Sequence, residues 1–162
     1  TVMHHTRIYS PEKARRKLAI ELNARLADAI DLKFQAKHAH WNVKGPRFIA
    51  LHELFDRLAA GLDAPIDDMA ERITTLAGTA NGTLALVAKA STLPAYPAEL
   101  ASGTAHVESL ANAYAAFARA LRKSIGVAQK QGDDGTADLF TSISQEIDKN
   151  LWLLEAHLQA ET

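Results

Sequence analysis

The sequence predicts an all-α fold, a four-helix bundle in which a long crossover between the second and third long helices carries one short helix. Alanine is the commonest residue, at 31 of 162 positions, whereas glycine and proline number only 8 and 5. Because alanine favours helices and the helix-breaking residues are clustered, long helical stretches are expected between the clusters. One connection is far longer than a turn, which is typical of a bundle with a crossover.

Capping residues and breakers set the expected helix boundaries. Ser10 can cap the first helix, and Pro11 fits the first helical position because its missing N–H is not needed there. In the second long helix we expect a kink at Pro65, because proline removes one backbone hydrogen bond. A tail of residues 1–9 precedes a single domain of residues 10–162. The long helices are expected over about residues 11–41, 47–76, 104–130 and 136–158, and the short helix over residues 83–90.

The composition excludes several classes of protein. With 18 basic and 19 acidic residues, a net charge of −1, the chain is not a dedicated nucleic-acid-binding domain. It has no cysteine, which excludes disulfide scaffolds and thiolate sites and leaves 7 histidines and the carboxylates as strong metal ligands. No apolar run approaches the roughly 18 residues of a membrane span, and the N-terminal residues lack a signal-peptide core. We therefore expect a soluble, cytoplasmic protein with no membrane association.

The second long helix has two faces of different chemistry. Two pairs of potential metal ligands share one side with small alanine residues, namely His52 with Asp56 and Asp67 with Glu71. The other side is apolar and is expected to face the bundle core. It carries Leu51, Leu54, Phe55, Leu58, Leu62, Ile66, Met69, Ile73 and Leu76.

The rise of an α-helix keeps these two pairs apart. Within each pair the side chains are one turn, about 6 Å, apart, but about 16 Å separates the pairs, which exceeds any metal–ligand distance. An antiparallel copy of the helix, related by a two-fold axis near Gly61, would bring the opposite ends together. His52 would then face the partner's Glu71, and Gly61 would permit the close approach. Asp56 would face the partner's Asp67, so that a symmetric dimer would hold two equivalent metal sites.

Each feature also has a purely structural alternative. A His/Asp or Asp/Glu pair at this spacing is most often a solvated helix face, and His40, at a helix end, is more often a cap. The sequence His52-Glu53 begins a zinc-protease motif, but Asp56 stands where that motif needs its second histidine. A di-iron site inside the bundle would need Glu-x-x-His twice, and the sequence does not contain it.

Several segments together resemble the signature of the Dps family, the mini-ferritins. The run from residue 40 to 56 reads HWNVKGPRFIALHELFD, and residues 67–72 continue it with DDMAER. Residues 136–138 (TAD) and 148–152 (DKNLW) are similar to the family's C-terminal motifs. The resemblance covers about residues 10–160, and the spacing of its histidines and acids is specific.

The resemblance implies a ferritin-like four-helix bundle that assembles into a hollow homododecamer. Such a shell oxidises Fe(II), preferably with hydrogen peroxide rather than oxygen, stores the ferric mineral and protects DNA from oxidative damage. The implied iron site lies between two subunits, in agreement with the helix geometry. Iron accepts both imidazole and carboxylate ligands. Carried over by position, His40, His52 and Asp56 come from one subunit, and Asp67 and Glu71 come from its partner.

The resemblance implies further roles, each with a structural alternative. Trp41 and Trp152 would lie near the iron site and quench radicals, or they simply pack. Asp134 and Asp138 would line a three-fold iron pore, although acids at a helix start also stabilise the helix dipole. Glu53 would nucleate the mineral, but the residue one turn later is basic, which weakens this role.

Sequence-independent DNA compaction is the alternative function, with association to the nucleoid. DNA-condensing members of the family typically carry a lysine-rich N-terminal tail, which this sequence lacks. The candidate phosphate contacts are Arg7, Arg15 and Arg16. We expect weak binding near neutral pH that falls with salt and strengthens toward pH 6, when His4 and His5 become charged.

Overall fold

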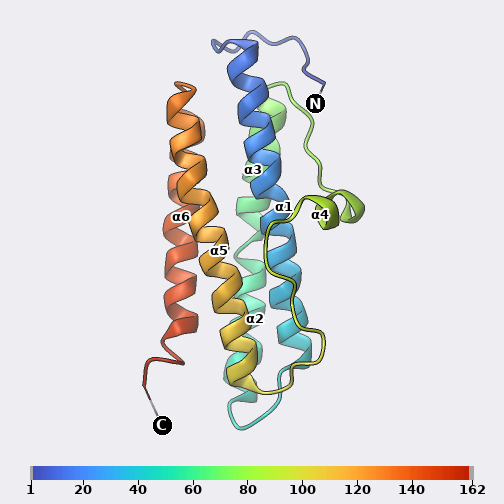
Figure 1. The fold of residues 1–162 in the computed structure, drawn as a ribbon, viewed down its shortest axis with the longest axis vertical. Helices are drawn as coiled ribbons and strands as arrows, with labels where there is room; N and C mark the ends of the chain where they lie inside the picture. Colours follow the sequence, from blue (N-terminus) through green and yellow to red (C-terminus); the bar gives the residue numbers. More distant parts are fainter. Residues whose placement is uncertain (1, 161–162) are drawn as a thin grey trace.

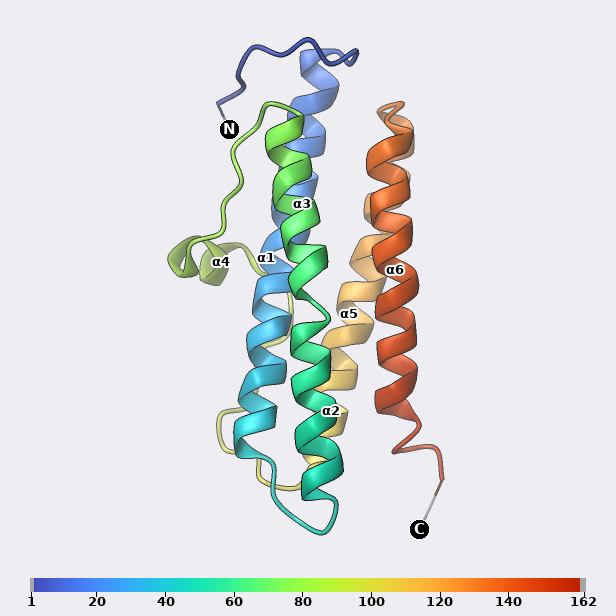
Figure 2. The same cartoon turned by 180° about the vertical axis from the view of Figure 1, so that it is seen from behind.

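Residues 2–160 of the computed structural model are described, and they form six helices (Figure 1). Four long rods run side by side, and one of them consists of two consecutive helices joined end to end (Figure 2). The described part of the chain contains no β-strand, and none of its helices is both long and apolar enough to cross a membrane. The predicted all-α four-helix bundle with a short crossover helix is therefore confirmed. The helices are α1 (Glu12–Asn42), α2 (Phe48–Ala60), α3 (Asp63–Thr75), α4 (Leu84–Ala90), α5 (Gly103–Lys130) and α6 (Asp134–Glu155).

The second long rod breaks earlier than the sequence predicted. The expected kink at Pro65 is wrong in position, because the helix is interrupted at Gly61 and Leu62, between α2 and α3. A proline ring clashes with the carbonyl four residues before it, here that of Gly61, and it has no N–H to donate. Helical bonding therefore stops at that carbonyl and resumes with the Ile66 N–H, which donates to Leu62 at 3.0 Å. Pro65 itself lies in the first turn of α3, where its missing N–H costs little.

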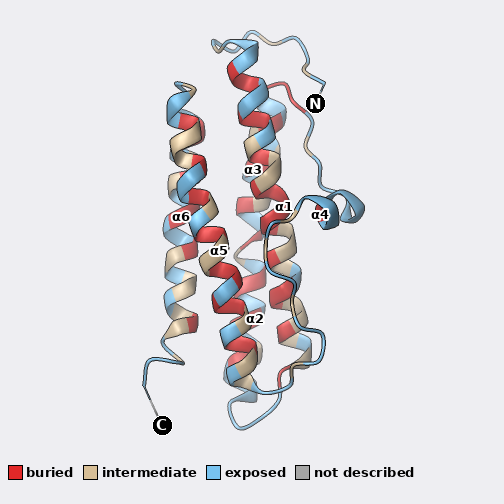
Figure 3. Ribbon diagram, in the orientation of Figure 1, coloured by how far each residue is buried: buried red, intermediate tan, exposed pale blue. Residues whose placement is uncertain are grey.

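The buried faces follow the predicted spacing (Figure 3). On α2 and α3, every residue of the predicted apolar face is buried except Ile66, which is partly exposed. On α5 the buried positions recur every three or four residues, as an amphipathic helix requires. The largest fully buried side chains, Tyr114, Phe55, Phe117 and Phe140, come from α2, α5 and α6 and fill the centre of the bundle.

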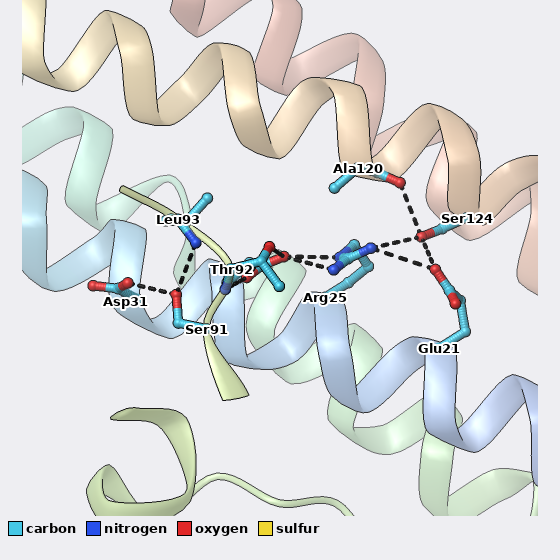
Figure 4. Close-up of polar contacts among 9 residues, drawn as sticks. Glu21, Arg25, Asp31, Ser91, Thr92, Leu93, Ala120 and Ser124 are labelled. Atoms are coloured by element: carbon cyan, nitrogen blue, oxygen red, sulfur yellow. Dashed lines mark hydrogen bonds and ion pairs between the residues drawn. The ribbon is translucent and has the colours of Figure 1, made fainter. Parts of the chain in front are cut away.

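A buried ion pair fixes the crossover to the bundle (Figure 4). Asp28 on α1 is completely buried and accepts hydrogen bonds from Arg25 Nη2 at 2.8 Å and from the backbone N–H of Thr92 at 2.7 Å. Arg25 also donates to Ser124 Oγ on α5, at 3.3 Å. The carboxylate and the guanidinium thus satisfy each other in the interior, where an unpaired charge would be costly. This network joins α1, α5 and the segment that follows α4.

Two further contacts continue the attachment along α1. Asp31, one turn after the buried aspartate, accepts a hydrogen bond from Ser91 Oγ. Gln35, another turn along, donates to the carbonyl oxygen of Pro94 at 3.1 Å. The polar positions of α1 therefore follow the path of the crossover and satisfy groups that its irregular backbone leaves unpaired.

Candidate metal site

The structure brings His40, at the end of α1, against His52 of α2. Nδ1 of His40 donates to the backbone carbonyl of His52 at 2.7 Å, and Nδ1 of His52 donates to the carbonyl of His40 at 2.8 Å. The two rings are stacked, with centroids 3.7 Å apart and planes at 21°. Because a carbonyl only accepts, both Nδ1 atoms carry hydrogen, which leaves Nε2 of each ring as the atom that can bind a metal. Each imidazole is thus held in the form that binds a metal through Nε2.

Asp56 lies one turn after His52 and is more than half exposed. Its Oδ1 accepts a hydrogen bond from Lys37 Nζ of α1 at 2.7 Å. This ammonium group holds the pKa of Asp56 below its usual value, and the nearby His40 and His52 act in the same direction. The carboxyl is therefore ionised, as a metal ligand must be.

Two lysines of α1 were not identified from the sequence. Lys37 contacts Asp56, and Lys33, one turn earlier, forms an ion pair with Asp63 at the start of α3. The signal was present, because positions 33, 37 and 40 recur at spacings of four and three and therefore share one face of α1. The two lysines and their carboxylate partners, Asp56 and Asp63, line a groove of about 290 Å³. Its walls are Lys33, Phe34, Lys37, Trp41, Asp56, Ala59, Ala60 and Asp63.

The other two candidate ligands lie apart from this groove. Asp67 and Glu71 are exposed on α3, one turn from each other, beyond the break in the rod. Within residues 2–160 of one chain, no group of three or more histidine and acidic side chains converges to hold a metal. One chain thus presents two separate partial ligand sets, and a site shared between subunits remains a prediction.

Gly61 does not have the surroundings that the sequence suggested. A side chain at this position would point toward α6, where Glu146 Oε1 is 3.6 Å from the position of a Cβ atom. Gly61 therefore faces another helix of its own bundle, and it is Ala59 and Ala60 that provide the small side chains beside Asp56.

The remaining candidates near the site occupy different surfaces. Trp41 lines the groove and is 63% exposed, and its ring lies 5.5 Å from Lys37 Nζ. Trp152 is also largely exposed, but it lies on α6 and does not line the groove. Glu53 is exposed on α2, and the described contacts include no ion pair between it and Arg57, the basic residue one turn later.

The pore candidates lie at the start of α6. Asp133 caps this helix, since its Oδ1 accepts from the Thr136 N–H at 2.8 Å and from Arg72 Nη2 at 2.9 Å. Asp134 and Asp138 are exposed and one turn apart on the same face. The capping role thus belongs to Asp133, and the two exposed carboxylates are available for another role.

One DNA-contact candidate is wrong. Arg15 is buried, and its guanidinium donates to the carbonyls of Ser10 at 3.2 Å and Leu76 at 3.0 Å. It therefore joins the N-terminal segment to the end of α3 and cannot reach a phosphate. Arg7 is exposed, and Arg16 is exposed with an ion pair to Glu12 at 2.7 Å.

Comparison with known proteins places this geometry in a family. Residues 20–161 match the ferritin-like domain family. The chain is 42% identical over 159 residues to the DNA protection during starvation protein of Agrobacterium fabrum, covering 98% of both chains.

Solved structures agree with the sequence relatives. A Dps structure from Mycobacterium smegmatis superposes with a TM-score of 0.93 at 31% identity, over 98% of this chain and 96% of that one. A Dps protein from Vibrio cholerae, described as a member of the ferritin-like diiron-carboxylate superfamily, gives a TM-score of 0.90 at 27% identity, over 98% and 99% of the two chains. The chain therefore belongs to the Dps family of ferritin-like proteins.

Proposed function

We propose that this protein oxidises Fe(II) at sites shared between two subunits and stores the ferric mineral inside a dodecameric shell. It acts in the cytoplasm, uses hydrogen peroxide in preference to oxygen, and thereby protects DNA from oxidative damage. The observation that carries the proposal is the pair of oriented imidazoles, His40 and His52, beside the ionised Asp56 on an exposed face. Asp67 and Glu71 of the partner subunit complete each site.

The chemistry of these groups supports iron as the substrate. Imidazole nitrogen and carboxylate oxygen together suit Fe(II), and the carboxylates suit the harder Fe(III) ion that forms. Before iron enters, the charge of Asp56 is balanced by Lys37 rather than by a metal. Incoming iron displaces this ammonium group from the carboxylate, so that the site need not hold a bare negative charge when empty.

The surface around the groove supports a partner subunit. Phe34, which lines the groove, is 48% exposed and also lines a second, mainly apolar groove of about 440 Å³ between α1 and α4. Leu84 of α4 lies in this second groove and is 72% exposed. Exposed apolar side chains that gather on one surface are a feature of protein–protein contacts. A second copy of the chain seated here would bring its own α3 carboxylates to the groove.

Mixed assembly tests the shared site. One variant carries His52→Ala and Asp56→Ala, and the other carries Asp67→Ala and Glu71→Ala. Each variant alone has no complete site and should lose rapid Fe(II) oxidation. When the two are co-expressed and pair at random, half of the dimers are mixed, and one of the two sites in each mixed dimer is complete. About one quarter of all sites should therefore recover.

Ferric absorbance after addition of Fe(II) and peroxide is the measurement, and native mass spectrometry confirms mixing. A separate comparison of peroxide with oxygen as oxidant tests the preference. Verified mixed shells as inactive as their parents would disprove the shared site. Wild-type shells that oxidise Fe(II) no faster than buffer would disprove the ferroxidase function.

DNA binding is the second candidate, favoured by the exposed basic residues near the start of α1. Arg7, Lys13, Arg16 and Lys17 are exposed there. Binding should weaken steeply with salt and strengthen toward pH 6. A gel-shift titration with linear DNA measures both trends, and the double substitution Arg7→Ala and Lys17→Ala should weaken binding. Tight, salt-resistant binding at pH 8 would contradict this account.

A further inference from the structure

A cluster of one tyrosine and two histidines lies between the crossover and the bundle. The ring of Tyr96 in the crossover stacks on His106 of α5, with centroids 5.9 Å apart, and contacts the edge of His38 of α1 at 5.3 Å. Nε2 of His38 is buried and has no hydrogen-bond partner in the described chain. Buried unpaired polar atoms are uncommon and often accompany a functional role. The cluster is separate from the proposed iron ligands.

Tyr96 and His106 are joined by a short hydrogen bond. The Tyr96 phenol oxygen lies 2.5 Å from Nδ1 of His106, and His106 is completely buried. Burial raises the pKa of Tyr96 and lowers that of His106, so near neutral pH the phenol is protonated and the imidazole is neutral. The phenol therefore donates and Nδ1 accepts. This arrangement lets the phenol proton move to the imidazole when the tyrosine loses an electron.

The cluster contacts both helices that carry the candidate iron ligands of one subunit. The ring of Phe55 is 6.3 Å from that of His106, and Phe55 immediately precedes Asp56 on α2. On α1, His38 precedes His40 by two residues. Both helices that provide the imidazoles and carboxylate of one subunit thus also contact the cluster.

The hydrogen bonds of the described chain join neither of the other two tyrosines to a basic side chain. Tyr114 is completely buried, and its hydroxyl donates to the carbonyl of Leu58 at 3.4 Å. A carbonyl cannot take up a proton near neutral pH. Tyr9 is fully exposed in the N-terminal segment. Tyr96 differs from both in that its hydroxyl is hydrogen-bonded directly to an imidazole, which can take up the phenol proton.

We propose that Tyr96, with His106 as proton acceptor, donates one electron when a site holding a single Fe(II) reacts with hydrogen peroxide. This inference rests on the proposed ferroxidase function. Peroxide needs two electrons and two protons to become two water molecules, and one Fe(II) supplies only one electron. Tyr96 supplies the second electron, and solvent supplies the two protons. The products are Fe(III), two water molecules, a neutral tyrosyl radical and protonated His106, with no hydroxyl radical released.

A second Fe(II) returns the cluster to its starting state. It gives one electron to the tyrosyl radical and becomes Fe(III), while the proton on His106 returns to the phenol oxygen. The sum of the two steps is two Fe(II) oxidised for each peroxide. The cluster thus allows a site that has received a single Fe(II) to reduce peroxide completely.

The test uses assembled shells of the full chain, labelled with ring-deuterated tyrosine in a parallel sample. Under anaerobic conditions, a single Fe(II) per proposed site is mixed with one equivalent of hydrogen peroxide. Freeze-quench electron paramagnetic resonance detects radicals, a spin trap detects hydroxyl radical, and ferric absorbance follows iron. The variants are Tyr96→Phe and His106→Gln, and Tyr114→Phe is the matched control because it removes a buried hydroxyl that is hydrogen-bonded to a backbone carbonyl and not to an imidazole.

Wild type and Tyr114→Phe should give a radical whose spectrum narrows on ring deuteration. Tyr96→Phe should lose this signal and trap more hydroxyl radical. His106→Gln should weaken the signal, and if it does not assemble, the two phenylalanine variants decide alone. Normal ferric absorbance without a tyrosyl signal, or a signal that persists in Tyr96→Phe, overturns the electron transfer alone. Ferric absorbance no faster than buffer overturns the proposed function and this inference together.

Discussion

Replacing Asp28 with asparagine should destabilise the protein far more than the same change at Asp31, one turn later. Asp28 is completely buried, and both of its carboxylate oxygens accept hydrogen bonds, from Arg25 and from Thr92. An asparagine there turns one acceptor into a donor and leaves Arg25 without its carboxylate. Breaking a buried pair from one side costs about 3–5 kcal/mol. The low end applies, because Glu21 Oε1 remains 3.4 Å from Arg25 Nη1.

A loss of about 3 kcal/mol corresponds to a melting temperature about 6–12 °C lower for a chain of this size. Asp31→Asn changes only partly exposed hydrogen bonds, to Ser91 and Gln35, and should cost about 1 kcal/mol. Calorimetry of both variants at equal protein concentration and in the same assembly state makes the comparison. Equal losses for the two variants would refute the assignment of the buried pair as the anchor of the crossover. So would a stable Asp28→Asn variant whose crossover is no more sensitive to protease than that of wild type.

Three further changes test other parts of the structure. Lys37→Met should tighten Fe(II) binding by up to about fivefold, because no ammonium group then competes with iron for Asp56. Equilibrium titration with Fe(II) measures the affinity, and Lys17→Met, the same change at another exposed lysine of α1, is the control. Gly135→Ala should lower the melting temperature, because its Cβ would lie 2.9 Å from Arg72 Nη2 and would push the guanidinium off its hydrogen bonds to Thr136 and Asp133. Gly126→Ala, with open space around it, should raise the melting temperature by removing a helical glycine. Burial lowers the pKa of His106, so below about pH 6.5 the unfolded chain binds more protons than the folded chain. The stabilisation from the neutral imidazole should therefore be full above that pH and should fall as the pH drops below it. Denaturant titrations over this pH range should show a flatter dependence of stability on pH for His106→Gln than for wild type.

The sequence was sufficient to predict the fold where that fold depends on apolar periodicity and on helix-breaking residues, which act locally. The apolar spacing of α2 and α3 predicted their buried face, and the clusters of glycine and proline predicted the connections. The break between α2 and α3 was misplaced because the steric effect of Pro65 acts on a carbonyl four residues earlier, not at the proline. Charged groups on α1 were harder to assign, since their partners come from distant segments. Arg15 looks like a surface cation in the sequence and becomes buried only because the end of α3 offers it a carbonyl.

The candidate site was predictable as a set of residues but not as an arrangement. Helical spacing paired His52 with Asp56, and only the resemblance to a family added His40. Neither source could show that the two imidazoles stack or that each binds the other's backbone. The ion pair between Lys37 and Asp56 was missed because it joins α1 to α2, and the sequence of a single helix does not indicate such a contact.

The exchange of hydrogen bonds between His40 and His52 changes how substitutions at this site must be interpreted. Each ring is positioned by the backbone of the other residue, so an alanine at one position removes a proposed ligand and also releases a carbonyl next to the other imidazole. The loss measured for either alanine variant would then contain part of its neighbour's contribution, and the two losses would not add. Asparagine separates the effects, because its amide nitrogen can replace Nδ1 as donor to the carbonyl while nothing replaces Nε2. A variant with asparagine at one position measures the contribution of one imidazole Nε2, and its difference from the alanine variant measures the contribution of holding the other ring in place.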